Sequence, residues 1–365
     1  MRLIHKNKRL CILITTLYTL LCAISGCAVV GPKSISSGRM QYNEVINKTE
    51  DEQMLLAIVK SRYEETFSLL AVNGIAANVR FSTNTAIQAG FGPKNNYVGE
   101  LTPFSAGMSY EENPTITYAP IQGEQYLRQL MSPIPLDLVV LISRSGTYPA
   151  RYYPLLINRV NDLENPEFLN VRSERSKLQF QRFVELSDEL EQAGIIDIVE
   201  DPKDNSFDLL MTDYSPAHIE IVREYLALLG ISISIDESED IIIPVYFAIK
   251  KGTAKAIAIS TRSTYDLLEI LSAAIDIPAE HVEAGFARKY PEMGLAGKNL
   301  TIHASKNKPK QALVAVQHHD YWFYIDHSDM NTKQFYVIVR TLWSVSMAAA
   351  SDKKVAPVLT IPVGG

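Results

Sequence analysis

The sequence predicts an α+β fold: a mixed, mostly antiparallel β-sheet with helices packed on it, following a signal peptide. Stretches with apolar residues at helical spacing are mixed with stretches in which apolar and polar residues alternate. These stretches do not follow the regular strand–helix–strand order that builds a parallel sheet, which favours antiparallel pairing. The third observation is one long uncharged run, which lies at the N-terminus.

Residues 1–26 have the parts of a secretory signal peptide. Residues 1–9 carry four basic residues and no acidic one, and residues 10–24 carry no charge. An apolar run of about 15 residues is shorter than the roughly 20 that a membrane-spanning helix needs. Residues 24–27, Ile-Ser-Gly-Cys, resemble the lipobox of bacterial lipoproteins. An uncleaved helical anchor that continues through Val30 is the alternative.

The lipobox resemblance implies that the Cys27 thiol receives a diacylglyceryl group. The peptide bond before Cys27 is then cut, and the new amine is acylated. Stable anchoring takes two or more acyl chains, which such a Cys27 provides. Residue 28 is Ala, whereas Asp at this place marks retention in the inner membrane in that family. We therefore expect a lipid anchor in the outer membrane, facing the periplasm, with the inner membrane and the cell surface as open alternatives.

Charge and cysteine content exclude several classes of function. The formal charge is −6 for the whole chain, and about −10 once the four basic residues of the signal peptide are removed. An acidic chain binds nucleic-acid phosphates poorly, so no nucleic acid is expected as a partner. The three cysteines are Cys11, Cys22 and Cys27. Because cleavage and lipidation would use all three, the mature chain would have no free thiol and no disulfide.

The composition changes along the mature chain suggest three segments. Residues 27–47 read as a lipid-anchored flexible linker, because their first part is rich in Ser and Gly and free of acidic residues. An N-terminal α+β domain is expected over residues 48–165 and a C-terminal α+β domain over residues 166–365. The boundary between them is soft and lies in the polar stretch 161–175.

The N-terminal half shows helical and strand patterns in turn. Thr49 and Glu52 form a capping-box pattern that predicts a helix starting there. Period-two alternation from Val79 to Ala89 predicts a half-buried strand. The further predictions are a loop over 90–107, a strand over 112–120, helices over 122–131 and 135–143, and an ambiguous segment at 151–160.

The C-terminal half predicts a second set of elements. Ser263 and Asp266 are expected to cap a helix that ends near residue 275. Pro244 would place the strand 240–252 at a sheet edge or at a bulge. The closing strand 357–363 reads as a buried central strand or as an edge strand. The other predictions are a helix over 174–193, a hairpin over 194–211, a helix capped by Ser215, strands over 300–305, 312–317 and 321–326, and a helix over 331–347.

The densest polar cluster lies between residues 318 and 329. Imidazole and carboxylate groups suit Zn²⁺ or Mn²⁺. If residues 321–325 form a strand, the two polar ends lie about 20 Å apart and cannot share an ion without another segment. The structural alternative is a hairpin turn at His319–Asp320 and a helix start near Asp326. The candidate ligand residues are His318, His319, Asp320, Asp326, His327 and Asp329.

Aromatic residues 321–324 offer a weak stacking platform. Alternate strand residues face opposite ways, so only one pair, Trp322 with Tyr324 or Tyr321 with Phe323, shares a face. We include Trp322 with the candidate region. The sequence contains no zinc-protease, phosphate-loop or dinucleotide-binding motif. No catalytic residue, resident metal or cofactor is predicted.

Four stretches together resemble lipoproteins of unknown function from Gram-negative bacteria. The similarity runs over most of the mature chain, and it supports the lipoprotein interpretation without implying a mechanism. The stretches are YNEVINKTEDEQMLLAIVKSRY (42–63), NPTITYAPIQGEQYLRQLMSPIP (113–135), YWFYIDHSDMNTKQF (321–335) and PVLTIPVGG (357–365).

Two hypotheses follow for function. The first is a non-enzymatic lipid-anchored envelope protein that binds or assembles with other envelope proteins or a glycan. The alternative is a periplasmic hydrolase, metal-assisted, that uses the region from His318 to Asp329. The convergence of those side chains in a cleft with a third ligand would favour the hydrolase.

Overall fold

The computed structural model describes residues 30–67, 69–86, 105–121, 124–144, 149–170, 173–201, 206–235, 239–248, 253–351 and 359–362. The chain divides into two compact units, Met1–Gln53 and Met54–Gly365. The predicted signal peptide and Cys27 lie outside the described residues. Among the helices of the described part, none is both long and apolar enough to cross a membrane.

Helix α2 (Val30–Arg62) begins earlier than the helix expected from Thr49 and includes residues assigned to the linker. Pro32 falls in its first turn, where the missing N–H of proline is tolerated. The hydroxyl of Thr49 donates to the Ile46 carbonyl oxygen at 2.9 Å, so Thr49 lies inside the helix and caps nothing. The capping-box prediction at Thr49 and Glu52 is therefore wrong.

A three-stranded sheet has the order β1-β2-β12. Strands β1 (Leu69–Ala86) and β2 (Ser105–Ile121) form a long antiparallel pair. Both strands begin earlier than predicted, β2 within the predicted loop over 90–107, and residues 87–89 of the first predicted strand lie outside the described residues. Strand β12 (Leu359–Pro362) pairs with residues 115–118 of β2. The closing segment thus forms an edge of this sheet, and not a central strand.

The six-stranded sheet has the order β4-β3-β8-β7-β6-β5. Every pairing in it is antiparallel except that of β7 with β8, which confirms the mixed, mostly antiparallel prediction. Strands β3 and β4 precede residue 166 and the other four follow it, so the sheet draws on both sides of the predicted soft boundary. The strands are β3 (Ile157–Val160), β4 (Leu163–Glu164), β5 (Ile196–Asp201), β6 (Ser206–Met211), β7 (Ile241–Phe247) and β8 (Ile257–Thr261).

Pro244 lies in β7, which is an interior strand by order, and neither pairing of β7 has a register shift. The prediction of a sheet edge or a bulge at Pro244 is therefore wrong. The parallel pairing of β7 with β8 begins only at Val245, opposite Ile257. Pro244 pairs on its other side with Asp208 of β6. The proline is tolerated because β8 does not yet pair with β7 at that position.

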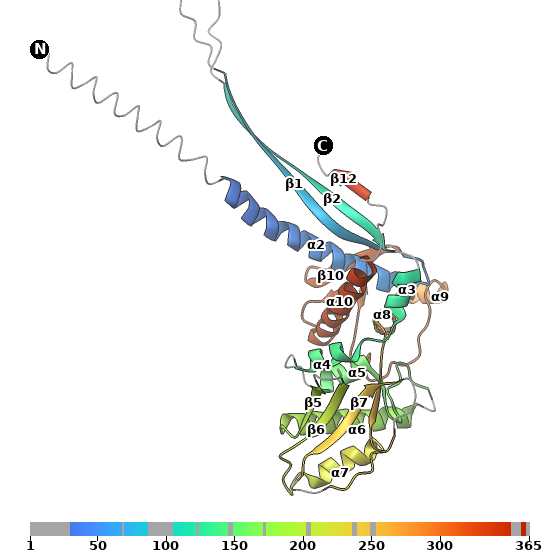
Figure 1. Ribbon diagram of the computed structural model, residues 1–365. Helices are drawn as coiled ribbons and strands as arrows, with labels where there is room; N and C mark the ends of the chain where they lie inside the picture. Colours follow the sequence, from blue (N-terminus) through green and yellow to red (C-terminus); the bar gives the residue numbers. More distant parts are fainter. Residues whose placement is uncertain are drawn as a thin grey trace, which may run out of the picture. The chain divides into compact units, whose positions relative to one another are not determined.

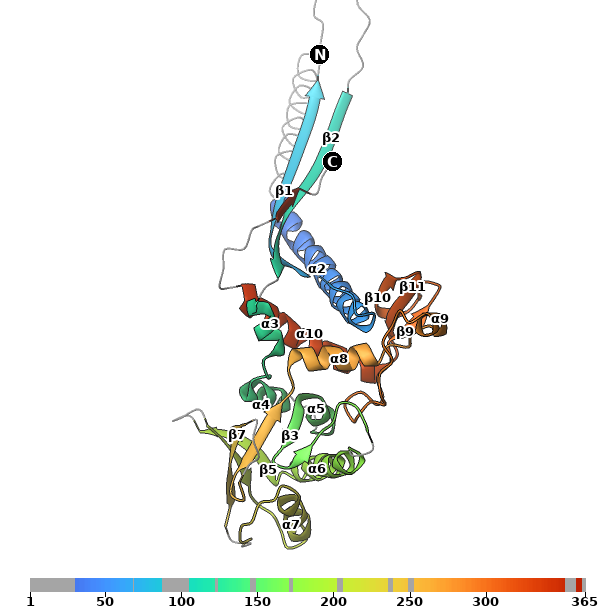
Figure 2. The same cartoon turned by 90° about the vertical axis from the view of Figure 1, so that its right-hand side faces the viewer.

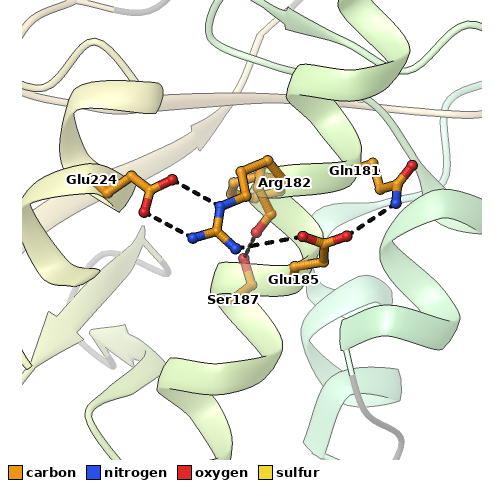
Figure 3. Close-up of polar contacts among 6 residues, drawn as sticks. Gln181, Arg182, Glu185, Ser187 and Glu224 are labelled. Atoms are coloured by element: carbon orange, nitrogen blue, oxygen red, sulfur yellow. Dashed lines mark hydrogen bonds and ion pairs between the residues drawn. The ribbon is translucent and has the colours of Figure 1, made fainter.

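Helices cover one side of the six-stranded sheet. In both views α6 (Glu174–Gln192) runs along the sheet with α7 (Ile219–Leu228) near it (Figure 1, Figure 2). Phe183, Leu186 and Leu190 are buried on α6, which lies within the helix predicted over 174–193. Arg182 of α6 donates to both carboxylate oxygens of Glu224 on α7, each at 2.8 Å (Figure 3).

The remaining helices complete the body that follows Gln53. Ser263 and Asp266 form the predicted capping box at the start of α8. The hydroxyls of Thr264 and Ser346 lie 3.3 Å apart and join α8 to α10. These helices are α3 (Glu124–Met131), α4 (Leu136–Arg144), α5 (Pro149–Leu156), α8 (Thr264–Ala273), α9 (Ala279–Glu283) and α10 (Met330–Ser351).

A third sheet has the order β10-β11-β9. Its strands are β9 (His303–Ser305), β10 (Ala312–His318) and β11 (Tyr321–Asp326), close to the predicted ranges. Positive φ angles of 44° at His319 and 63° at Asp320 make the two-residue turn between β10 and β11. Two successive positive φ angles suit the right-handed twist of a hairpin. The predicted turn at His319–Asp320 is confirmed.

Candidate functional site

Two segments far apart in the sequence bring a carboxylate and two imidazoles together. Glu65 follows the end of α2, where Glu64 has a φ of 56° and the Glu65 amide donates to the Lys60 carbonyl oxygen at 2.9 Å. His318 is the last residue of β10, and His319 begins the turn. Figure 2 shows β10 and β11 beside the C-terminal end of α2. Backbone structure therefore positions all three side chains.

The Glu65 carboxylate faces both histidines. Its Oε1 atom lies 2.7 Å from His319 Nε2, which donates a hydrogen bond, and its Oε2 atom lies 3.2 Å from His318 Nε2. One ligand atom from each of the three residues lies within 4.8 Å of the others. We call Glu65, His318 and His319 the carboxylate–imidazole cluster.

Tyr63 packs against both histidines of this cluster. Its ring is buried and lies 5.2 Å from the His318 ring and 5.1 Å from the His319 ring, measured between centroids. A hydrogen bond of 2.6 Å joins the Tyr63 hydroxyl to Nδ1 of His281 on α9. A third imidazole is thereby held beside the cluster, with its ring centroid 6.1 Å from that of His319.

The cluster perturbs two of its own ionisable groups. The hydrogen bond from His319 holds the pKa of the Glu65 carboxyl below its ordinary value. Burial lowers the pKa of His318 and outweighs the opposing effect of Glu65. The nearby Lys60 ammonium acts in the same direction on both groups. These shifts favour an ionised carboxylate beside a neutral His318 imidazole.

The other candidate residues do not join the cluster. Asp326 accepts hydrogen bonds from the amide and hydroxyl of Ser328 at the far end of β11. Asp329 accepts from the Thr332 amide and hydroxyl at the start of α10. His327 is exposed in the same turn, where its carbonyl accepts from Lys333. This end of the region therefore forms a helix start.

The middle of the region serves packing. Trp322 is half-buried, with the Lys308 ammonium 4.9 Å from its ring centroid. Phe323 is fully buried on the opposite side of β11, whereas Tyr321, the other residue of its pair, is half-buried. Asp320 is exposed in the turn. The hydrolase hypothesis stays a prediction, and only His318 and His319 of its residues share a site.

Sequence reasoning missed Glu65, Tyr63 and His281. No motif spacing links Glu65 to the hairpin, because 254 positions separate Glu65 from His319. His318 and His319 belong to the predicted candidate region, but the carboxylate that they face is brought to them by tertiary packing.

Comparisons with known proteins found no matching protein-family model, no matching curated protein and no matching solved structure. The arrangement of the site is therefore the basis for its chemistry. A carboxylate that faces two imidazoles can act as an ion-pair lock between segments, or its atoms can ligate one divalent ion.

Proposed function

We propose that the chain is a lipid-anchored component of the bacterial cell envelope that faces the periplasm and works by binding another envelope protein. The observation that carries this proposal is Ile24-Ser25-Gly26-Cys27 at the end of an uncharged run, which a basic segment precedes. These features are typical of a lipoprotein signal peptide. Ala28 after the cysteine favours the outer membrane.

An exposed apolar strip on the six-stranded sheet supports a binding role. Burial alternates along β7, so that Ile241, Ile243 and Val245 lie in the core. On the other face Ile242 is 63% exposed and Tyr246 is 39% exposed. A partner that covers Ile242 and Tyr246 would remove their exposed apolar surface from water, which favours association.

The anchor is tested by mass spectrometry of the chain purified from Gram-negative membranes. We expect the wild-type chain to lack residues 1–26 and to carry acyl groups on Cys27. Cys27→Ala should leave the chain unprocessed. Cys22→Ala is the matched control, because this cysteine lies inside the segment that is removed, and it should be processed normally. An intact wild-type N-terminus with an unmodified Cys27 would contradict the proposal.

The binding role is tested by affinity purification from mild-detergent membranes. We expect one stoichiometric envelope protein with the wild-type chain and its loss with Ile242→Asp. Leu178→Asp is the control, because Leu178 is 57% exposed on α6 and lies outside the strip. Recovery of the lipidated chain alone, or equal recovery of the partner by Ile242→Asp, would contradict the binding role.

A further inference from the structure

The carboxylate–imidazole cluster has the ligand types and the spacing of a transition-metal site. Two histidines, one glutamate and a water molecule are a known ligand set of zinc enzymes. Imidazole suits Zn²⁺, Cu²⁺ and Ni²⁺, whereas Mg²⁺ and Ca²⁺ prefer oxygen ligands alone. The cluster therefore favours a first-row transition metal.

Distances within the cluster agree with a shared ion. Zinc binds histidine nitrogen at about 2.0–2.1 Å, so two ligand atoms on a tetrahedral ion lie roughly 3.3 Å apart. The separation of 3.2 Å between His318 Nε2 and Glu65 Oε2 matches this value. The contact of 2.7 Å between His319 and Glu65 must lengthen. Both side chains are over a third exposed, which leaves them room to move.

His318 supplies an independent observation. Its Nε2 atom is buried and makes no regular hydrogen bond within the described residues, although the Glu65 Oε2 atom lies 3.2 Å away. Buried polar atoms are nearly always paired, so an unpaired one requires an explanation. A metal ion between His318 and Glu65 would accept the lone pair of this nitrogen.

The surroundings hold the ligands in place. Tyr63 packs against both imidazole rings and is fixed by its hydrogen bond to His281. The positive charge of Lys60 opposes a cation, and the negative charge of Glu65 offsets it. The backbone segments that carry the ligands are therefore fixed, while the exposed Glu65 and His319 side chains can make the small shift that an ion requires.

We propose that Glu65, His318 and His319 bind one divalent transition-metal ion, with Zn²⁺ as the best fit, and that solvent completes the coordination. The ion joins the end of α2 to the hairpin of β10 and β11. This proposal depends neither on the lipid anchor nor on catalysis. Metal binding would then contribute to the stability of the folded chain, because the unfolded chain lacks a preformed site.

The test is calorimetric titration of Zn²⁺ into the full chain in detergent, purified without a polyhistidine tag and stripped with a chelator. We expect one equivalent to bind and the Tm to rise. Glu65→Gln and His319→Gln should each weaken binding by at least about 100-fold, since even groups outside the ligand shell change affinity by 10–100-fold. The visible spectrum of bound Co²⁺ should show nitrogen and oxygen ligation, and the two variants should lack it.

His327→Gln is the matched control, because His327 is exposed at the other end of the same hairpin. It should bind Zn²⁺ as the wild type does, and circular dichroism should show that every variant is folded. A folded wild-type chain that binds no Zn²⁺ would overturn the proposal. Unchanged affinity in both Glu65→Gln and His319→Gln would also overturn it.

Discussion

The Nε2 atom of His319 lies 2.7 Å from the Oε1 atom of Glu65, although 254 positions of the sequence separate the two residues. The contact can form only when the C-terminal hairpin has docked against the end of α2. Both histidines of the hairpin approach the same carboxylate, and Tyr63 packs beneath them. The cluster thus reports on a long-range contact of the fold.

Acid should weaken this contact and lower the free energy of unfolding. Burial holds the pKa of His318 below 6.5, and the His319 hydrogen bond holds that of Glu65 below 4.5. The folded chain therefore binds fewer protons than the unfolded chain. The stability from each group is present above the unfolded pKa and is lost as the pH falls through the folded pKa.

Urea unfolding from about pH 7 to about pH 3 measures this dependence. Glu65→Gln should remove the loss of stability that the wild type shows below pH 4.5, because the amide does not titrate. His318→Gln should remove the loss of stability that the wild type shows as the pH falls below 6.5. If both variants lose stability with falling pH as steeply as the wild type does, the cluster contributes nothing to the acid sensitivity of the fold.

Tyr63→Phe should destabilise the folded chain through loss of the hydroxyl. His281 is only 7% exposed, and its Nδ1 atom would lose its partner at 2.6 Å. An unpaired buried polar atom costs about 1–3 kcal/mol, and urea unfolding should show a decrease of that size. Tyr246→Phe on the exposed face of β7 should have almost no effect. Equal stability of Tyr63→Phe and the wild type would contradict a structural role for this hydrogen bond.

The sequence correctly predicted those features of the fold that depend on residues close together in the chain. The capping box at Ser263 and Asp266 needs only four neighbouring residues, and it forms as predicted. The turn at His319–Asp320 is similarly local. Thr49 shows the limit of such signals, because its hydroxyl also has a carbonyl within reach inside a longer helix, and that contact forms instead.

Contacts between distant segments were not predictable from one sequence. His318 and His319 were singled out by residue type alone, and only the packing of the hairpin against the end of α2 places Glu65 beside them. Pro244 shows the same effect in the sheet, since its tolerance depends on where pairing with β8 begins. In both cases the deciding neighbour lies far away in the chain.

Arg262→Ala should destabilise the chain far more than Arg182→Ala. The Arg262 side chain is 0% exposed and donates to Glu167 at 2.6 Å and to the Asn165 carbonyl oxygen at 2.9 Å. Removing it leaves Glu167 without its partner, a change that typically costs about 3–5 kcal/mol. Arg182 makes a two-pronged contact with Glu224 in solvent (Figure 3), where water screens the charges.

Urea unfolding of the two variants measures the contrast. Each removes one arginine that binds a glutamate, so the lost charge is matched. We expect a large shift of the unfolding midpoint for Arg262→Ala and a small one for Arg182→Ala. Equal shifts would show that burial of the Arg262 pair is not what makes it important.

Glu191 on α6 should make the chain less stable as the pH rises towards neutrality. Burial, with the negative charges of Asp188 and Asp197, raises the pKa of the Glu191 carboxyl from 4.5 to about 7. The folded chain therefore binds more protons than the unfolded chain between these values. The stability from Glu191 is fully present below pH 4.5 and is lost as the pH rises through about 7. This pH dependence is opposite to that of Glu65 and His318, whose contribution is lost as the pH falls.

Glu191→Gln should keep this position neutral at every pH. We expect the variant to gain stability relative to the wild type as the pH rises, with little difference below 4.5, because there the wild-type carboxyl is also protonated. Urea unfolding of both chains across this range is the measurement. Glu189→Gln, an exposed position on the same helix, controls for the loss of one charge. A stability difference that stays constant with pH would show that Glu191 does not titrate in this range.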